Sequence, residues 1–79
     1  MTNTALLEQI IADSGYKKSY IAKVLGIRIE TLGRKIRNLS SFTTREVDLL
    51  CEVLSITDLE QKEAIFYYRG VADLATREE

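Results

Sequence analysis

Eight basic side chains and one acidic side chain lie between residues 16 and 45 of this 79-residue chain. The basic residues are Lys17, Lys18, Lys23, Arg28, Arg34, Lys35, Arg37 and Arg45, and the acid is Glu30. This block carries a net charge of +7, whereas residues 1–15 carry −2 and residues 46–79 carry −6. Such asymmetry predicts a basic face that binds an anionic partner such as DNA. An uneven scatter of charge over an ordinary solvated surface is the alternative.

The other residue types argue against catalysis. The chain has no histidine, which is the commonest general base and metal ligand, and it has no glycine-rich phosphate loop or metal-ligand spacing. Cys51 is the single cysteine, which excludes an internal disulfide and suits a reducing cytoplasm. Its place between Leu50 and Val53 predicts a small, buried or half-buried helix residue. We therefore expect no enzyme activity, no catalytic residue, no metal, no cofactor and no small-molecule substrate.

Nothing in the sequence indicates a membrane or export signal. No apolar run approaches the ~20 residues that are needed to span a bilayer. The N-terminus lacks a basic region followed by an apolar segment, so a signal peptide is not expected. The predicted location is the cytoplasm, without membrane contact.

Two short helices joined at Gly26 are predicted inside the basic block, over about residues 18–25 and 29–37. Their apolar stripes, at three- and four-residue spacing, are Ile21, Val24 and Leu25 in the first and Ile29, Leu32 and Ile36 in the second. Ala22 is small enough for the second helix to cross closely, and Gly26 tolerates the backbone angle of a tight turn. The pattern predicts a helix-turn-helix whose second helix can lie in a DNA major groove.

Three further helices complete an all-α fold, a compact bundle of about five short helices. Asn3 or Thr4 can cap the first helix, and Gly15 ends it. The stretch Thr43-Thr44-Arg45-Glu46 predicts a capping box at the start of the fourth helix. No segment alternates with a period of two residues, so no strand is expected.

The fifth helix is predicted from a second capping box, Thr57-Asp58-Leu59-Glu60, to about Tyr68, with Gly70 ending it. Residues 71–79 form a tail expected to be partly helical or frayed. With no linker and no internal repeat, residues 1–79 are predicted to be a single domain.

The two helices of the motif begin without a capping side chain. Lys17 and Arg28 stand at the capping positions, and neither can accept a hydrogen bond from a free amide, which forgoes roughly 1 kcal/mol each. Positive charge at that end of a helix costs a further ~0.3–1 kcal/mol. A bound phosphate would remove both penalties, whereas simple lack of good caps is the alternative.

The order Ile21-Ala22, Gly26-Ile27, Thr31-Leu32 resembles the Cro/CI-type (XRE-like) helix-turn-helix family of phage and bacterial repressors, over about residues 4–55. The continuation from Phe42 to Leu54, and Ile65-Phe66-Tyr67, are similar to small regulators of Gram-positive phages and prophages. The resemblance implies a lambda-repressor-like domain that reads a double-stranded operator and regulates transcription. The family usually has an apolar residue where this chain has Lys35. Ile36 can replace it, which leaves the rotation of the third helix open.

The resemblance places base-reading contacts at Arg28, Ile29, Glu30, Gly33 and Arg34. Arg34 can grip guanine through two hydrogen bonds, and Arg28 can do the same or bind phosphate. Glu30 can accept from a cytosine amino group or compensate the helix dipole. Ile29 can touch a thymine methyl group, although a role in the core is the simpler expectation. Glycine at position 33 costs ~1 kcal/mol in a helix, which either close DNA approach or local crowding would explain.

Phosphate contacts, which position the protein without reading sequence, are expected from Lys17, Lys18, Lys35, Arg37, Asn38 and Ser40. Arg37 is the weakest candidate among these, because a basic residue at a helix C-terminus also stabilises the helix through its dipole. Tyr16 and Tyr20 flank the same face, where one can reach phosphate, although a half-buried packing role is the simpler expectation.

A homodimer is expected, because proteins of this size usually bind two half-sites ~34 Å apart. The predicted dimer surface comprises Tyr67, Tyr68, Val71 and Leu74, with Leu59 and Phe66 as further members unless the core needs them. Another phage regulator is a further candidate partner. The alternative function is a protein-interaction module, such as an antirepressor or an inhibitor of a host defence protein, whose acidic final third contacts a basic partner.

Overall fold

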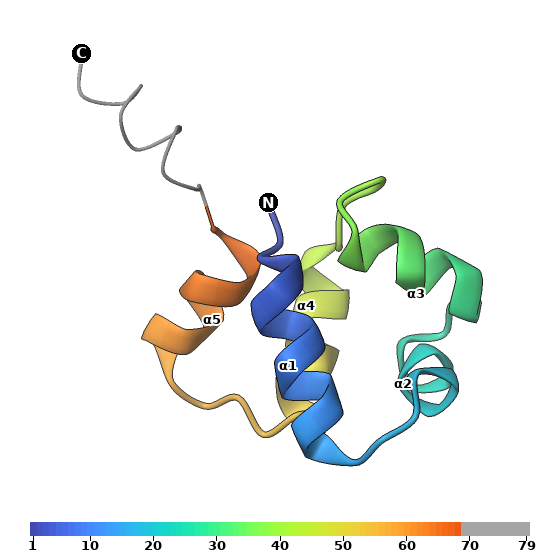
Figure 1. Cartoon of the computed structure of the whole chain (residues 1–79), viewed down its shortest axis with the longest axis horizontal. Coiled ribbons are helices and arrows are strands. Elements are labelled where there is room, and N and C mark those ends of the chain that lie inside the picture. Colours follow the sequence, from blue (N-terminus) through green and yellow to red (C-terminus); the bar gives the residue numbers. More distant parts are fainter. Residues whose placement is uncertain (69–79) are drawn as a thin grey trace.

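The computed structural model describes residues 1–68, which form five α-helices and no strand (Figure 1). The helices are α1 (Thr4–Ser14), α2 (Lys18–Leu25), α3 (Ile29–Ile36), α4 (Thr44–Val53) and α5 (Leu59–Phe66). The all-α helix-turn-helix fold is thus confirmed. Gly70 and the predicted tail 71–79 lie outside the described residues. No helix in the described part is long and apolar enough to cross a membrane.

Local sequence signals place most of the helix ends correctly. The Asn3 side chain accepts a hydrogen bond from the Leu6 amide and caps α1, while Gly15 ends that helix at a φ of 80°. Gly26 ends α2 at a φ of 74°, the left-handed conformation that glycine adopts without steric cost. The capping box of Thr43 and Glu46 is present at the start of α4.

The prediction for α5 was wrong at both ends. Asp58, and not Thr57, is its N-cap, and the Asp58 side chain accepts from the amide of Glu60 at 3.0 Å. This one-residue shift places Glu60 second in the helix, where it cannot complete a capping box, which requires the third position. The helix ends at Phe66, two residues before the predicted end.

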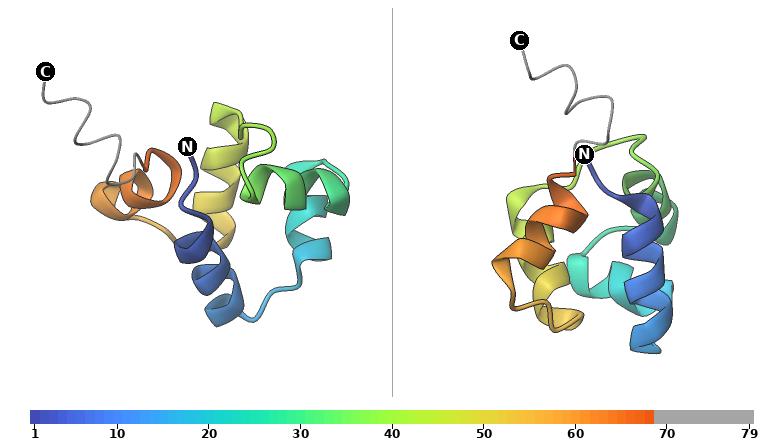
Figure 2. Two further views of the ribbon diagram at one scale, coloured as in Figure 1. Left: turned by 45° about the horizontal axis from the view of Figure 1, so that its top comes forward. Right: turned by 60° about the vertical axis from the view of Figure 1, so that its left-hand side comes forward.

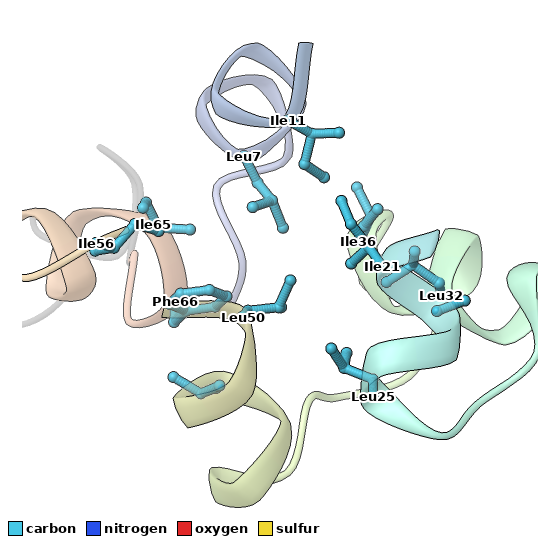
Figure 3. Close-up of a cluster of buried hydrophobic side chains, with 12 residues drawn as sticks. Leu7, Ile11, Ile21, Leu25, Leu32, Ile36, Leu50, Ile56, Ile65 and Phe66 are labelled. Carbon is cyan, nitrogen blue, oxygen red and sulfur yellow. The ribbon is translucent and has the colours of Figure 1, made fainter. Parts of the chain in front are cut away.

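The core lies between the helices, and all five contribute to it (Figure 3). Its buried apolar residues are Leu7, Ile11, Ile21, Ala22, Leu25, Leu32, Ile36, Val47, Leu50, Ile56, Ile65 and Phe66. Helices α1 and α4 occupy the centre, whereas α3 and α5 lie at opposite sides of the domain (Figures 1 and 2). One face of α3 is therefore free of intramolecular packing.

Ile29 does not belong to this core, in contrast to the predicted apolar stripe. It is 46% exposed, whereas Leu32 and Ile36 of the same helix are fully buried. Ile29 is the first residue of α3, and the core meets this helix only from Leu32 onward. An apolar side chain is thus presented to solvent beside the basic residues of the helix.

The first residues of the chain fix the far end of α3. The Thr4 hydroxyl donates to the Ile36 carbonyl at 2.5 Å, and the Asn3 amide donates to the Ile65 carbonyl at 2.6 Å. The N-terminal segment consequently joins the end of α3 to the end of α5. These contacts, with the packing of α2 against α3 and α4, hold α3 in a defined orientation.

Candidate nucleic-acid interface

The outer face of α3 carries apolar, acidic and basic side chains next to one another. Leu32 and Ile36 point into the core, and with about 100° of rotation per residue Glu30, Gly33 and Arg34 are turned away from it. These three residues line a shallow groove together with Ile29 at the exposed start of the helix and with Arg37 and Leu39 after its end. We call these six residues the α3 groove. Four of the five residues expected to read bases lie in it together.

The charged groups of this surface are available for a ligand. Within residues 1–68, no ion pair engages Arg28, Arg34, Arg37 or Glu30. All four residues are exposed. Arg28 is the N-cap of α3 and stands at the start of the helix, outside the residues that line the groove. The face thus offers three guanidinium groups and one carboxylate to a partner.

Gly33 is not required by crowding inside the protein. A Cβ atom built at this position would meet only Nη1 of Arg37, at 3.3 Å, and that atom is the end of a flexible side chain. Gly33 also has an ordinary helical φ, so no backbone strain explains the glycine. Of the two explanations that the sequence left open, close approach of a partner is the one that this geometry favours.

The weak helix starts predicted for the motif are present. Lys17 and Arg28 have extended backbones at the N-cap positions of α2 and α3, and neither side chain makes a capping hydrogen bond. The only acid in either first turn is Glu30. Both helix starts therefore keep free amides next to a positive charge, a combination that suits an anion.

Lys18 has an intramolecular partner. Its Nζ lies 2.8 Å from Oε1 of Glu8 on α1, with the two side chains 42% and 40% exposed. An ion pair at this exposure is weak and readily exchanged. A phosphate that binds Lys18 must therefore compete with the Glu8 carboxylate.

The prediction that Lys35 contacts phosphate needs correction. Its Nζ donates to Oε1 of Glu46 at 2.6 Å, and the two side chains are only 12% and 9% exposed. Lys35 is thus half of an internal ion pair at the position for which the Cro/CI resemblance implied an apolar residue, while Ile36 fills the core as expected. Because its ammonium is already bound and covered, Lys35 leaves the set of available phosphate contacts.

The environment of Glu46 favours its charged form. Burial by itself raises the pKa of this carboxyl, but hydrogen bonds from Lys35 and Thr43 outweigh it, and the pKa lies below the ordinary value of 4.5. The Glu46 side chain is therefore an anion at neutral pH.

Asn38 also needs correction as a phosphate contact. Its Nδ2 donates to the Thr2 carbonyl and its Oδ1 accepts from the Thr2 amide, both at 2.8 Å. The amide group is thus used for holding the N-terminal segment. Arg37 and Ser40, on either side of it in the sequence, are exposed and stay available.

Tyr16 and Tyr20 pack against each other at the start of α2. Their rings stack with centroids 5.2 Å apart and an interplanar angle of 28°. Both are roughly half exposed, so one face of the pair meets solvent.

Cys51 is half-buried, as its sequence context predicted. Burial raises the pKa of its thiol, the nearby Lys62 ammonium opposes this, and the Asp48 carboxylate adds to it. The thiol is therefore protonated at neutral pH and is a poor nucleophile. Within the described residues, no cluster of three metal-binding side chains exists.

The predicted dimer surface is only partly described. Tyr67 and Tyr68 are exposed, while Phe66 is buried in the core. Leu59 is 66% exposed, so the core does not need it. Val71 and Leu74 lie outside the described residues. Tyr67, Tyr68 and Leu59 thus present apolar surface around α5.

Three residues that matter for this surface were missed from the sequence, namely Thr2, Glu8 and Glu46. Each one holds a side chain that had been assigned to DNA. A signal existed only for Glu46, because a lysine at a position that the Cro/CI resemblance implies to be apolar needs an acidic partner if it is buried. The contacts of Thr2 and Glu8 depend on how α1 lies against the motif.

The comparison with known families supports the central segment of this surface. Residues 3–39, which span α1, α2 and α3, match the family model of the Bacterial regulatory protein, Fis family. The match covers less than half of the chain and does not single out the Cro/CI-type family. No curated protein and no solved structure matches the chain. The chain therefore carries a helix-turn-helix similar to that of Fis-family bacterial regulatory proteins, which supports a DNA-binding transcription regulator.

Proposed function

We propose that this protein is a sequence-specific regulator of transcription that binds double-stranded DNA and reads the major groove with α3. The observation that carries the proposal is the α3 groove, in which Ile29, Glu30, Gly33 and Arg34 share one unpacked helix face. A helix with this width and this exposed chemistry fits the major groove, where base edges differ in donors, acceptors and methyl groups. The match to a bacterial regulatory family supports the same function.

The side chains of the groove suit distinct base contacts. Arg34 can donate two hydrogen bonds to guanine, and Glu30 can accept from a cytosine amino group. Ile29, exposed at the start of α3, suits contact with a thymine methyl group. Arg28 at the N-cap can read a base or bind a neighbouring phosphate. Gly33 lets the helix backbone approach the base edges closely.

Phosphate contacts would orient α3 in the groove. Lys17 and Lys18 stand at the start of α2, and Arg37 and Ser40 stand at and after the end of α3. In the sequence, the two lysines precede α3, and Arg37 and Ser40 follow its last residue. Such contacts give affinity that falls steeply with salt but carry no sequence information.

We further propose a phage or prophage repressor of the Cro/CI type that acts as a homodimer. The motif around Ala22 and Gly26, and the two helices that follow it, support this assignment. The exposed Tyr67 and Tyr68, which follow α5, support self-association. Two such subunits would place two copies of α3 on half-sites ~34 Å apart.

The test of the proposed function is selection of duplexes from a random-sequence pool, followed by affinity measurements over a salt series. We expect a palindromic site and a steep loss of affinity with salt. Binding without any sequence preference would reject sequence-specific regulation. No binding at low salt would reject DNA as the ligand and favour the protein-interaction module. Sedimentation of the wild type and of Tyr67→Ser/Tyr68→Ser, with and without the site, tests the dimer.

A further inference from the structure

The Lys35 ammonium and the Glu46 carboxylate form the most buried ion pair in the described part of the chain. One oxygen of Glu46 has two functions. Oε1 accepts from Lys35 Nζ at 2.6 Å and from the Thr43 backbone amide at 2.9 Å, the latter as part of the capping box of α4. The same atom thus joins the side of α3 to the first turn of α4.

The position of Lys35 on α3 gives this link a mechanical consequence. Leu32 and Ile36 point into the core and Arg34 points away from it, so Lys35 lies on the flank between the two faces. A link on the flank of a helix adds to the core packing a further contact that resists rotation about the helix axis. The pair also encloses residues 36–45, which include the candidate phosphate contacts Arg37 and Ser40.

Stability alone does not explain a buried ion pair at this position. Replacing such a pair by uncharged residues of similar volume is often neutral or stabilising, because removing two charges from water offsets their attraction. An uncharged, apolar residue at position 35 would bury more easily. An ion pair with a defined hydrogen bond, in contrast, fixes both distance and direction.

We propose that Glu46 is a positioning residue for base reading, which acts through Lys35 by setting the rotation of α3 about its own axis. This inference rests on the proposed function of the α3 groove. Glu46 itself touches no base. It determines in which direction Arg34 and Glu30 point when the helix enters the groove.

The test is the double variant Lys35→Met/Glu46→Gln. It removes the ion pair without changing the net charge, so electrostatic attraction to DNA is preserved. Glutamine can replace glutamate in a capping box, so the start of α4 is also preserved. The matched control is Lys62→Met/Asp48→Asn, which removes the exposed ion pair between α5 and α4 in the same charge-neutral way.

The first readout is the ratio of affinities for the selected site and for a shuffled duplex at one salt concentration. We expect the double variant to unfold at nearly the wild-type temperature and to bind the shuffled duplex equally well. Its preference for the selected site should fall about tenfold, the loss that follows from one weakened base contact. The control should keep the preference, and Lys35→Arg, which keeps the donor, should retain most of it.

The second readout needs no DNA. Residual dipolar couplings of backbone amides report the tilt of a helix and its rotation about its axis, and they should change for α3 but not for α1. Unchanged couplings, or an unchanged preference for the selected site, would overturn the positioning role. If the wild type prefers no sequence, the proposed function fails, and the couplings still decide whether Glu46 sets the rotation of α3.

Discussion

The side-chain amide of Asn38 pairs with both backbone groups of Thr2, which precedes it in the chain by 36 residues. Asn38 follows Arg37, the C-cap of α3, and has a φ of 66°, a conformation that asparagine tolerates better than most residues. Thr2 is almost fully buried as a result. The pairing holds the end of the proposed reading helix against the beginning of the chain.

The contribution of this pairing can be measured with Asn38→Gly. Glycine accepts the positive φ without steric cost, so the variant removes the two hydrogen bonds and little else. We expect the free energy of unfolding to fall by about 1–2 kcal/mol, since each such bond contributes roughly 1 kcal/mol. Asn38→Ala should lose about 1 kcal/mol more, because a Cβ atom opposes the left-handed conformation. Urea unfolding that shows wild-type stability for Asn38→Gly would contradict a role for the pairing.

Gly33→Ala should separate folding from DNA binding. Alanine is favoured over glycine in a helix by about 1 kcal/mol, and the added Cβ meets only a movable end of Arg37. We therefore expect urea unfolding to show higher stability, and binding assays to show weaker affinity for the selected site. A variant that is less stable than the wild type would indicate that internal crowding, and not DNA, requires the glycine.

Arg34→Ala and Lys17→Ala should have different effects on DNA binding. Loss of the Arg34 guanidinium should reduce discrimination between the selected site and altered sites by ~1–3 kcal/mol. Loss of the Lys17 ammonium should weaken binding to all duplexes alike and lower the slope of log affinity against log salt by about 1. Titrations of both variants on two duplexes over a salt series check this. Identical behaviour would reject the division into reading and positioning residues.

Glu8→Gln should strengthen DNA binding, because it releases Lys18 from its ion pair. Any lost negative charge raises affinity somewhat, so the matched control is Asp13→Asn, at an acid of the same helix that accepts a hydrogen bond from Gln9 and pairs with no cation in residues 1–68. We expect a gain of a few-fold on random duplex DNA for Glu8→Gln beyond that of the control, in line with ~0.5–1 kcal/mol for an exposed pair. Equal gains for the two variants would mean that Lys18 does not contact DNA.

The lowered pKa of Glu46 predicts a pH dependence of stability. A carboxyl whose pKa is lower in the folded state stabilises the fold above its unfolded value of 4.5, and this contribution is lost as the pH falls through the lower folded value. Urea unfolding from about pH 6 to about pH 2 should therefore show a steeper loss for the wild type than for Glu46→Gln. Parallel curves would contradict an ionised and paired Glu46.

The sequence predicted what depends on neighbours in the chain. As expected, Asn3 and Thr43 cap their helices, and glycines end α1 and α2. Lys17 and Arg28 make no capping hydrogen bond, which was also expected. Each depends on interactions within about four residues, which sequence spacing specifies directly. The prediction of where α5 starts was wrong because two adjacent residues, Thr57 and Asp58, were both suitable N-caps.

Only the tertiary structure decided which of the polar side chains are free to bind a ligand. Lys35, Asn38 and Lys18 looked equivalent to other candidates in the sequence, but their partners stand 11, 36 and 10 residues away along the chain. Whether such a partner is reached depends on how α1 and α4 pack against α3. Ile29 is exposed for the same reason, because the edge of the core is defined by the packing of all helices and not by the apolar pattern of one.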